Sequence, residues 1–247
     1  VPFLDQASTF RKVDLSKLDL ESDEAICFFA NLYHVMVRHM LLVLGPPSSA
    51  KDWPSTFVQV SYEVGGDVFS LQELEHCVLR GRLPRPNLKD LPKRFAPLPP
   101  ENDHHYMYKL GKADARMSLF LNNASQSNPP MVYLLTPRAL DEQLNRACQT
   151  FVDYTVKTDP KKRQLRVHKA FQLYARDLQP RATSKDMIRY SLRFVMLDLS
   201  TLDVDFSQVS VRYHPYLLKC HETMNLLDLP ASADTSTSTD TAEPSSA

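Results

Sequence analysis

The sequence predicts an α+β fold that is mainly helical and surrounds a small, mostly antiparallel sheet. Three observations predict it: a long apolar segment at residues 25–44, an alternating pattern around Gly65-Gly66, and an amphipathic stretch at residues 71–80. With 247 residues, 43% of them hydrophobic, the chain is long enough for one sizeable core. Only 5 glycines stand against 18 prolines, which suits helices joined by stiff connections.

The most apolar segment, residues 25–44, is predicted to be a buried helix that stops at the Gly-Pro-Pro after it. Its length also suits a membrane span, but Arg38 and His39 would then lie deep in lipid at a cost of several kcal/mol. Asn31, His34 and Arg38 follow one another at i, i+3 and i+7, so they share one face of the helix. A polar stripe on a buried helix needs hydrogen-bonding partners.

A β-hairpin is predicted at residues 57–69, because apolar residues alternate up to Tyr62 before the Gly-Gly turn. Ser70 then has the position of a helix N-cap, with Glu73 three residues later as in a capping box. The helix predicted to follow covers residues 71–80 and ends at a glycine.

Short helices and strands are predicted for the second half of the chain. Thr136 has the position of an N-cap, with Pro137 in the first helical position of a helix that runs to about Val156. Residues 84–100 carry several prolines and are predicted to form an irregular crossing. The other predicted elements are a buried segment at residues 117–121, a polar loop at 122–128, an extended segment at 131–135, strands at 163–167 and 209–216, and helices at 169–178 and 184–195, the last capped by Ser184.

We expect three parts along the chain. Residues 1–24 form an N-terminal arm packed on the domain, residues 25–222 a single globular domain, and residues 228–247 a disordered tail. The tail is rich in Ser, Thr and Ala, and it lacks the apolar surface that would offset the entropy of ordering. A start at Val1 suggests a piece of a larger multidomain protein.

The balance of charges bears on partners and location. Lys+Arg and Asp+Glu are 29 each, which favours neither nucleic acid nor an anionic membrane. We therefore expect no nucleic-acid partner and no transmembrane segment, and as partner another protein or other domains of the parent chain. The four cysteines are widely spaced in apolar stretches without a Cys-x-x-Cys pair, which predicts buried free thiols and an intracellular, cytoplasmic location.

Three segments carry motifs in a fixed order. They are Phe29-Ala30-Asn31-Leu32-Tyr33-His34, then Leu74-Glu75-His76-Cys77-Val78-Leu79-Arg80 after the Gly-Gly hairpin, then Asp114-Ala115-Arg116 through Leu121-Asn122 to Pro129-Pro130. Together they resemble the family called Domain of Unknown Function 547. Its motifs are an aromatic-x-Asn-Leu-Tyr-Asn helix, a Gly-Gly hairpin with an Ile-Glu-His-Gly-Ile-Leu-Arg helix, and an Asp-Pro-Arg-Ile-His-Phe-Ala-Leu-Asn-Cys loop ending in Ser-Cys-Pro-Pro. The resemblance covers about residues 3–220, and the matching site residues are Asn31, Glu75, His76, Arg80, Arg116 and Asn122.

The chain departs from this family at three positions of the loop. Ser118 stands where the family has His, and Asn123 and Asn128 stand where it has Cys. The Cys/His-rich loop implies a thiol nucleophile in the family. Since an amide neither ionises to a nucleophile nor shuttles protons near neutral pH, the resemblance implies a degenerate member, a pseudoenzyme.

Glu75 and His76 are the catalytic candidates that remain. Neighbouring helical residues point about 100° apart, so the two do not form a direct proton relay. Asn122 or Asn31 would have to orient His76, or it is a structural histidine. The eight histidines show no His-Glu-x-x-His or His-x-His spacing, so we expect no metal and no cofactor.

Two hypotheses for function follow. The first is a non-catalytic binding or protein-interaction module on an enzyme-like scaffold. The alternative is a hydrolase or transferase with a cleft built around His76, Asn31 and Asn122. By analogy, a papain-like or transglutaminase-like arrangement of the α+β fold is compatible with either hypothesis. The residues of the candidate polar cluster are Asn31, His34, Arg38, Arg80, Arg116, Ser118, Asn122 and Asn123. An open cleft would favour catalysis, and a closed hydrogen-bonded cluster the module.

Overall fold

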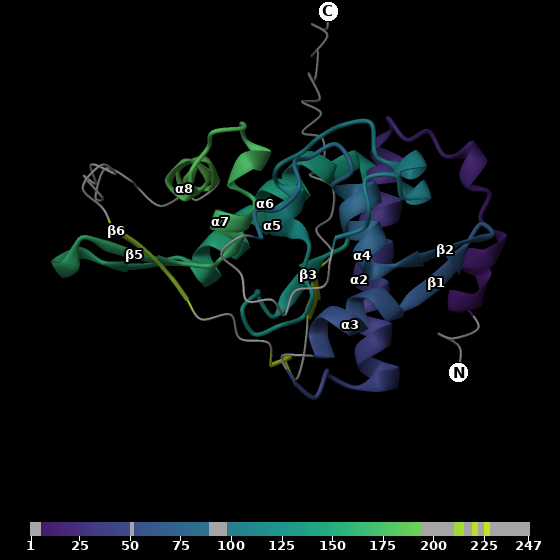
Figure 1. Ribbon diagram of the computed structural model, residues 1–247, viewed down its shortest axis with the longest axis horizontal. Helices are drawn as coiled ribbons and strands as arrows, with labels where there is room; N and C mark the ends of the chain where they lie inside the picture. Colours follow the sequence, from purple (N-terminus) through teal and green to yellow (C-terminus); the bar gives the residue numbers. More distant parts are fainter. Residues whose placement is uncertain are drawn as a thin grey trace, which may run out of the picture.

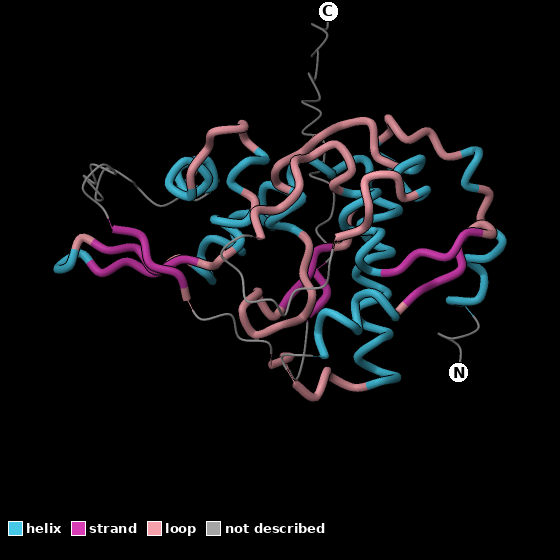
Figure 2. The backbone as a smooth tube through the Cα atoms, in the orientation of Figure 1, coloured by secondary structure: helices cyan, strands magenta, loops and turns pink. Residues whose placement is uncertain are grey.

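The computed structural model describes residues 6–49, 52–88, 98–193, 210–214, 219–221 and 225–227. Helices make up most of it, and the strands lie at three separate places, which Figure 2 shows in magenta. The α+β fold class is therefore confirmed. The hairpin β1–β2 lies at one end of the molecule and the sheet of β5 and β6 at the other, with α2, α5 and α6 between them (Figure 1).

The helices and strands have the following bounds. The helices are α2 (Asp23–Leu44), α3 (Asp52–Gln59), α4 (Leu71–Glu73), α5 (Met117–Phe120), α6 (Leu140–Thr155), α7 (Ala170–Leu173) and α8 (Ser184–Leu192). The shorter helical turns are η1 (Ser8–Lys12), η2 (Leu15–Lys17), η3 (Leu74–Leu79), η4 (His104–Tyr108), η5 (Pro137–Ala139), η6 (Pro160–Lys162) and η7 (Ala175–Asp177). The strands are β1 (Ser61–Val64), β2 (Asp67–Ser70), β3 (Met131–Tyr133), β4 (Lys157–Asp159), β5 (Gln164–Val167), β6 (Ser210–Tyr213) and β7 (Asn225–Leu227).

Helix α2 is the centre of the larger hydrophobic core, as the sequence predicted. Ser22 caps it by accepting the N–H of Ala25 at 3.1 Å, and two acidic residues in the first turn favour the positive end of the helix dipole. The helix ends at Gly45, which has a φ of 73°. By length and composition this helix could cross a membrane, but 56% of its most apolar window is buried inside the protein, as in the central helix of a folded core.

The hairpin β1–β2 begins later than the sequence suggested. The predicted strand from residue 57 was wrong at its start, because Phe57 belongs to α3, where its ring stacks on buried Trp53 at 5.8 Å. The turn itself is confirmed. Gly65 is required there, since its φ is 61° and a Cβ would lie 2.7 Å from the carbonyl oxygen of Val13. The N-terminal segment packs against the same hairpin, with the carbonyl of Phe10 accepting the N–H of Gly65 at 3.1 Å.

The helix predicted at residues 71–80 is present, but most of it is π-helical. The capping box of Ser70 and Glu73 is confirmed, and α4 continues directly into η3. The N–H of Arg80 donates to the carbonyl of Glu75 at 2.9 Å, a bond that spans five residues. Such wide turns often occur at functional sites, because they change the direction of the side chains that follow.

The elements predicted for the second half of the chain occur in the expected order, but β4 and β7 were not predicted. Pro137 opens η5 as expected, but Thr136 makes no side-chain cap, and its N–H donates to Oε1 of Gln143 at 2.8 Å. The cap predicted for Ser184 was wrong, since Thr183 accepts the N–H of Asp186 and forms a capping box. The predicted strand at 163–167 and helix at 169–178 correspond to β5 and to α7 with η7. Residues 89–97, 194–209 and 228–247, which include part of the predicted crossing and the predicted disordered tail, lie outside the described residues.

The buried apolar side chains form two clusters. The larger one surrounds α2, η3 and the first part of α6, and the smaller one lies among the end of α6, β5, α7 and α8. The strands are divided over three small sheets, in which β1–β2 and β4–β5 are antiparallel and β3–β7 and β5–β6 parallel. Arg80 after η3 and Asp177 of η7 pair where elements of the two clusters meet.

Candidate functional site

The guanidinium of Arg80 is the centre of a buried polar network. It follows the π-helical turn η3, and its side chain is only 1% exposed. Nη1 donates to Oγ of Ser118 at 2.7 Å, and the two terminal nitrogens contact both carboxylate oxygens of Asp177 at 3.1 and 3.2 Å. Nη2 also donates to the carbonyl of Pro84 at 3.0 Å. This two-pronged pairing fixes both the position and the orientation of the carboxylate.

Asp177 completes the network from the other apolar cluster. The hydroxyl of Ser118 donates to its Oδ2 at 2.5 Å. Burial raises the pKa of Asp177 to about 6, although Arg80 and Ser118 both act to lower it. The network therefore joins η3, α5 and η7 through one charged pair that is removed from water.

Glu75 extends the network through two tyrosines. Its Oε1 accepts the hydroxyl of Tyr174 at 3.0 Å, and its Oε2 accepts that of Tyr33 at 3.3 Å. The guanidinium of Arg80 lies over the ring of Tyr174, 4.2 Å from its centre, which is the geometry of a cation–π contact. His76 lies beside this group, with Nε2 at 3.8 Å from Oε1 of Glu75, too far for a hydrogen bond.

His76 lines a small cavity. Its volume is about 190 Å³, and its walls include Arg80, Arg85, Glu101 and Tyr106. Burial lowers the pKa of His76 to about 4, against the attraction of Glu75. The imidazole is therefore neutral at pH 7. Neither Asn31 nor Asn122 belongs to the lining of this cavity, so the structure does not bring them to His76.

Asn31 and His34 of α2 contact backbone atoms of the loops that cover the helix. Asn31 accepts the N–H of Leu135 and donates to its carbonyl, both at 2.9 Å. Nε2 of His34 accepts the N–H of Asn122 at 3.1 Å. Burial lowers the pKa of His34 to about 3. Arg38, the third residue of the predicted stripe, is exposed, so the stripe is polar along its length but buried only in part.

The loop of residues 122–128 is closed by its own amides. Nδ2 of Asn122 donates to the carbonyls of Pro129 and Met131 at 2.8 and 3.1 Å. Oδ1 of Asn123 accepts the N–H of Ser125 at 3.1 Å and Nδ2 of Asn128 at 2.7 Å.

The backbone of the same loop takes an unusual form at Ala124, which has a φ of 65°, rare for a residue other than glycine. Its N–H donates to Oδ1 of Asn122 at 2.8 Å. His221 holds the far end, since its Nε2 donates to the carbonyl of Asn128 at 2.7 Å. The amides and one histidine thus hold the conformation that the loop adopts.

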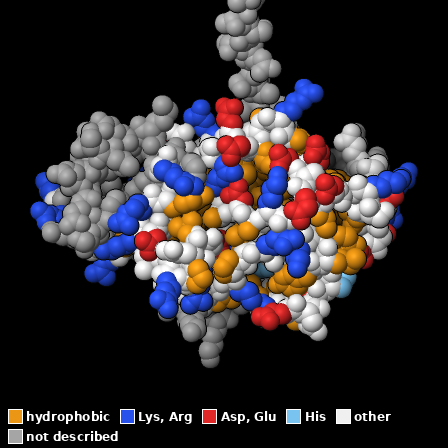
Figure 3. Space-filling model, turned by 90° about the horizontal axis from the view of Figure 1, so that it is seen from above, with side chains coloured by type: hydrophobic (Ala, Val, Ile, Leu, Met, Phe, Trp, Pro, Cys, Tyr) orange, Lys and Arg blue, Asp and Glu red, His pale blue; other side chains and the backbone are white. Residues whose placement is uncertain are grey.

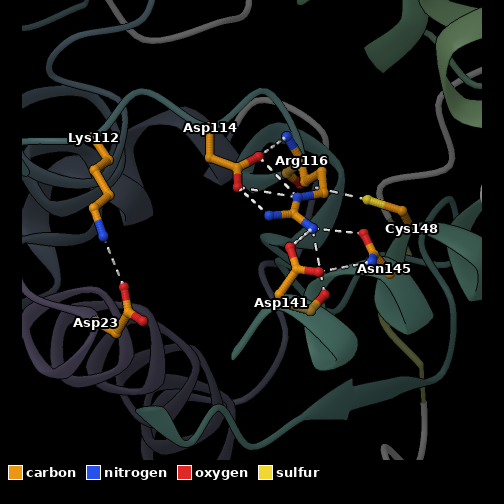
Figure 4. A network of polar contacts seen from close by, with 7 residues as sticks. All are labelled: Asp23, Lys112, Asp114, Arg116, Asp141, Asn145 and Cys148. Atoms are coloured by element: carbon orange, nitrogen blue, oxygen red, sulfur yellow. Dashed lines mark hydrogen bonds and ion pairs between the residues drawn. The ribbon is translucent and has the colours of Figure 1, made fainter. Parts of the chain in front are cut away.

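Arg116 forms a separate cluster at the start of α6. Figure 4 shows its guanidinium between Asp114 and Asp141, which it contacts at 2.6 Å each, and beside Asn145 at 2.5 Å. Burial opposes its charge, but hydrogen bonds and attraction from the two carboxylates together outweigh this and raise the pKa of Arg116. A cavity of about 330 Å³ lies next to the cluster and is also lined by Lys112, whose Nζ donates to Asp23 of α2 at 3.1 Å.

Apart from exposed Arg38, the predicted site residues fall into three groups. One joins Arg80 and Ser118 with Glu75 and His76, and another joins the asparagines with His34. Arg116 belongs to the third. Sequence reasoning missed Asp177 and Tyr174, because their types and spacing carry no motif, and it did not single out Tyr33, although this residue lies in the first motif. Within the described residues, the side chains that gather closely enough for a metal ion are Asp103, His104 and His105, which belong to none of these groups.

Comparison with family models finds one match, to the family described as "Protein of unknown function, DUF547", over residues 17–152. That span is more than half of the chain. The chain belongs to this family. Comparisons with curated proteins and with solved structures found no match.

The DUF547 span ends inside α6, so it contains Arg80 and Ser118 but neither Tyr174 nor Asp177. The resemblance of the motifs extended further, to about residue 220. The carboxylate of the buried pair thus comes from the part of the chain beyond the matched span.

Proposed function

We propose that this DUF547 domain is a non-catalytic binding or protein-interaction module on an enzyme-like scaffold. The observation that carries the proposal is the closed loop at residues 122–128. The position where the resemblance implies a nucleophile holds Asn123, whose Oδ1 accepts two hydrogen bonds from its own loop. Both histidine rings that contact this loop also bind its backbone, His34 at the N–H of Asn122 and His221 at the carbonyl of Asn128.

The polar side chains of this loop serve its conformation. An oxyanion site or a general base needs a donor or an acceptor that is free to face a substrate. The amides of Asn122 and Asn128 donate to acceptors within the chain, so they support a scaffold rather than a reaction.

The alternative, a hydrolase or transferase that uses His76, draws support from the cavity beside that residue. Two quantities weigh against it. The cavity of about 190 Å³ is smaller than the roughly 300–1,000 Å³ of usual ligand pockets. A group with a pKa of about 4 is also a weak base at pH 7, where a base with a pKa near the working pH transfers protons best.

Charge and thiols support the proposed partner class and location. On the face in Figure 3, basic and acidic side chains are interspersed, which suits a protein partner or another domain better than nucleic acid. All four cysteines are buried free thiols, as the sequence predicted, which favours an intracellular, cytoplasmic location.

The substitution Asn123→Cys tests the proposal. If the loop is only structural, the new thiol reacts with iodoacetamide at pH 7 no faster than the exposed thiol of a control, Asp153→Cys on α6. Circular dichroism verifies that both variants are folded. A rate at least about tenfold above that of the control would show a thiolate activated by its surroundings and would overturn the non-catalytic reading.

A further inference from the structure

Four potential metal ligands gather where α4 meets the start of η4. Asp103 is the N-cap of η4, and its Oδ1 accepts both the N–H of His105 at 3.0 Å and Nδ1 of the same residue at 2.8 Å. Oε1 of Glu73 approaches the same Nδ1 from the end of α4, at 3.6 Å. Nδ1 of His104 lies 4.0 Å from Oδ1 of Asp103. Asp103, His104 and His105 thus hold ligand atoms that all lie within 4.8 Å of one another, and Oε1 of Glu73 lies beside this group.

The separations of these atoms suit a small metal ion. Zinc bonds of about 2.0–2.1 Å in a tetrahedron separate neighbouring ligand atoms by roughly 3.3 Å. The observed separations of 2.8, 3.6 and 4.0 Å lie on both sides of that value. Small shifts would therefore bring Asp103, His104 and His105 to coordination distance, and a larger turn of the side chain of Glu73 would add the fourth ligand.

Contacts with the rest of the protein already hold two of the ligands, His105 and Glu73, in place. Nε2 of His105 donates to the carbonyl of Val68 in β2 at 2.9 Å, which turns Nδ1 toward the carboxylates. Metal-binding histidines commonly donate their second nitrogen to a carbonyl in this way. Oε2 of Glu73 accepts the N–H of Ser70 at 2.7 Å and leaves Oε1 toward the cluster.

His104, the fourth ligand, is the one that an ion in solution can reach. The side chain of His104 is 64% exposed, while that of His105 is 3% exposed. An ion from solvent therefore meets His104 first, and the side chain of His104 has room to turn toward the three buried or half-buried ligands. The ring centres of the two histidines are already 3.8 Å apart.

We propose that Glu73, Asp103, His104 and His105 form a binding site for Zn²⁺, with two nitrogen and two oxygen ligands. Imidazole and carboxylate are ligands that zinc accepts in tetrahedral sites. The ion takes the place of the proton between Nδ1 of His105 and Asp103, and that proton leaves to solvent. Its effect is to link the hairpin and α4 to η4, two segments that lie far apart in the sequence.

A zinc titration of the full chain tests the site. The protein is prepared without a histidine tag and is freed of metal with a chelator. It is then titrated with ZnCl₂ in competition with a chromophoric chelator. We expect one ion per chain and a rise in Tm on zinc addition. Co²⁺ should give the visible absorption of a tetrahedral site.

Two variants and a control locate the bound ion. His104→Ala removes an exposed ligand, and Glu73→Gln keeps an acceptor for the capping box, so both should fold. Each should weaken zinc binding at least about tenfold and abolish the rise in Tm, while His214→Ala, which changes a histidine outside the cluster, should do neither. Absence of stoichiometric binding, or equal affinity in His104→Ala and the unaltered protein, would overturn the proposal.

Discussion

Acid should destabilise this protein through two buried histidines, one from each apolar cluster. Nε2 of His34 accepts the N–H of Asn122, and Nδ1 of His168 accepts the N–H of Ala170 at 3.0 Å. A ring nitrogen that accepts a hydrogen bond cannot carry a proton. Burial lowers the pKa of both residues to about 3, with the charge of His214 adding to the effect on His168.

The direction and the size of this pH effect follow from the numbers of protons that the folded and the unfolded chain bind. In the unfolded chain a histidine has a pKa of about 6.5, so between pH 6.5 and 3 the unfolded state binds more protons than the folded state. Stability from each histidine is fully present above pH 6.5 and is lost as the pH falls. At pH 5 the difference is about 1.5 pH units, or about 2 kcal/mol for each residue.

Two conservative variants isolate this effect. In His34→Gln and His168→Asn the new carbonyl oxygen can take the place of the accepting nitrogen, but it does not titrate. Urea unfolding, followed by the fluorescence of Trp53, the one tryptophan of the chain, gives the free energy of unfolding at pH 7 and 5. Each variant should lose about 2 kcal/mol less than the unaltered protein over this interval, and between pH 7 and 8 no such difference should appear.

The comparison must be made between proteins at the same pH. Asp177 changes the free energy of unfolding in the opposite direction. Its pKa is raised to about 6, so its protonation offsets part of the loss of stability as the pH falls. Subtracting the change in free energy of unfolding of the unaltered protein from that of each variant removes the contribution of Asp177. If His34→Gln and the unaltered protein lost the same free energy of unfolding between pH 7 and 5, His34 would not be a buried neutral acceptor, and the reasoning would fail.

Two further predictions concern buried groups. Asp177→Ala should lower the free energy of unfolding by about 3–5 kcal/mol, because it leaves the buried guanidinium of Arg80 and the hydroxyl of Ser118 without the acceptor they share, whereas exposed Asp153→Ala should change it by less than about 0.5 kcal/mol. In urea unfolding, a loss below about 1 kcal/mol for Asp177→Ala would contradict the buried network. The native thiols should not react with Ellman's reagent at pH 8, since burial raises the pKa of Cys27, Cys77 and Cys148 to about 12 and also raises that of Cys220. Four should react in urea, and rapid reaction of any thiol in the native protein would refute this burial.

The sequence predicted best what local pattern determines. The capping box of Ser70 and Glu73 and the Gly-Gly turn depend on residues within a few positions, and both are present. The start of the hairpin was wrong, because the alternation at residues 58, 60 and 62 spans the end of α3 as well as β1. There the burial of Trp53 against Phe57 favours the helix over the strand pattern.

The candidate site was predicted only in part, because its contacts cross long stretches of chain. Arg80 and Ser118 were singled out, but their shared partner Asp177 is an ordinary acidic residue in a short helical turn. The proposed zinc ligands could also be predicted from the sequence only in part. The pair His104-His105 was visible in the sequence, whereas Glu73 lies beside it only after folding.

The asparagines of the loop hold its closed conformation. Oδ1 of Asn123 accepts two hydrogen bonds, from the N–H of Ser125 and from Asn128. A cysteine at this position offers a single sulfur, which is a weak acceptor, so Asn123→Cys would leave donors of the loop poorly paired at a cost of about 1–3 kcal/mol. The amide at position 128 likewise supplies the donor that reaches residue 123. The amides of Asn123 and Asn128 therefore stabilise each other.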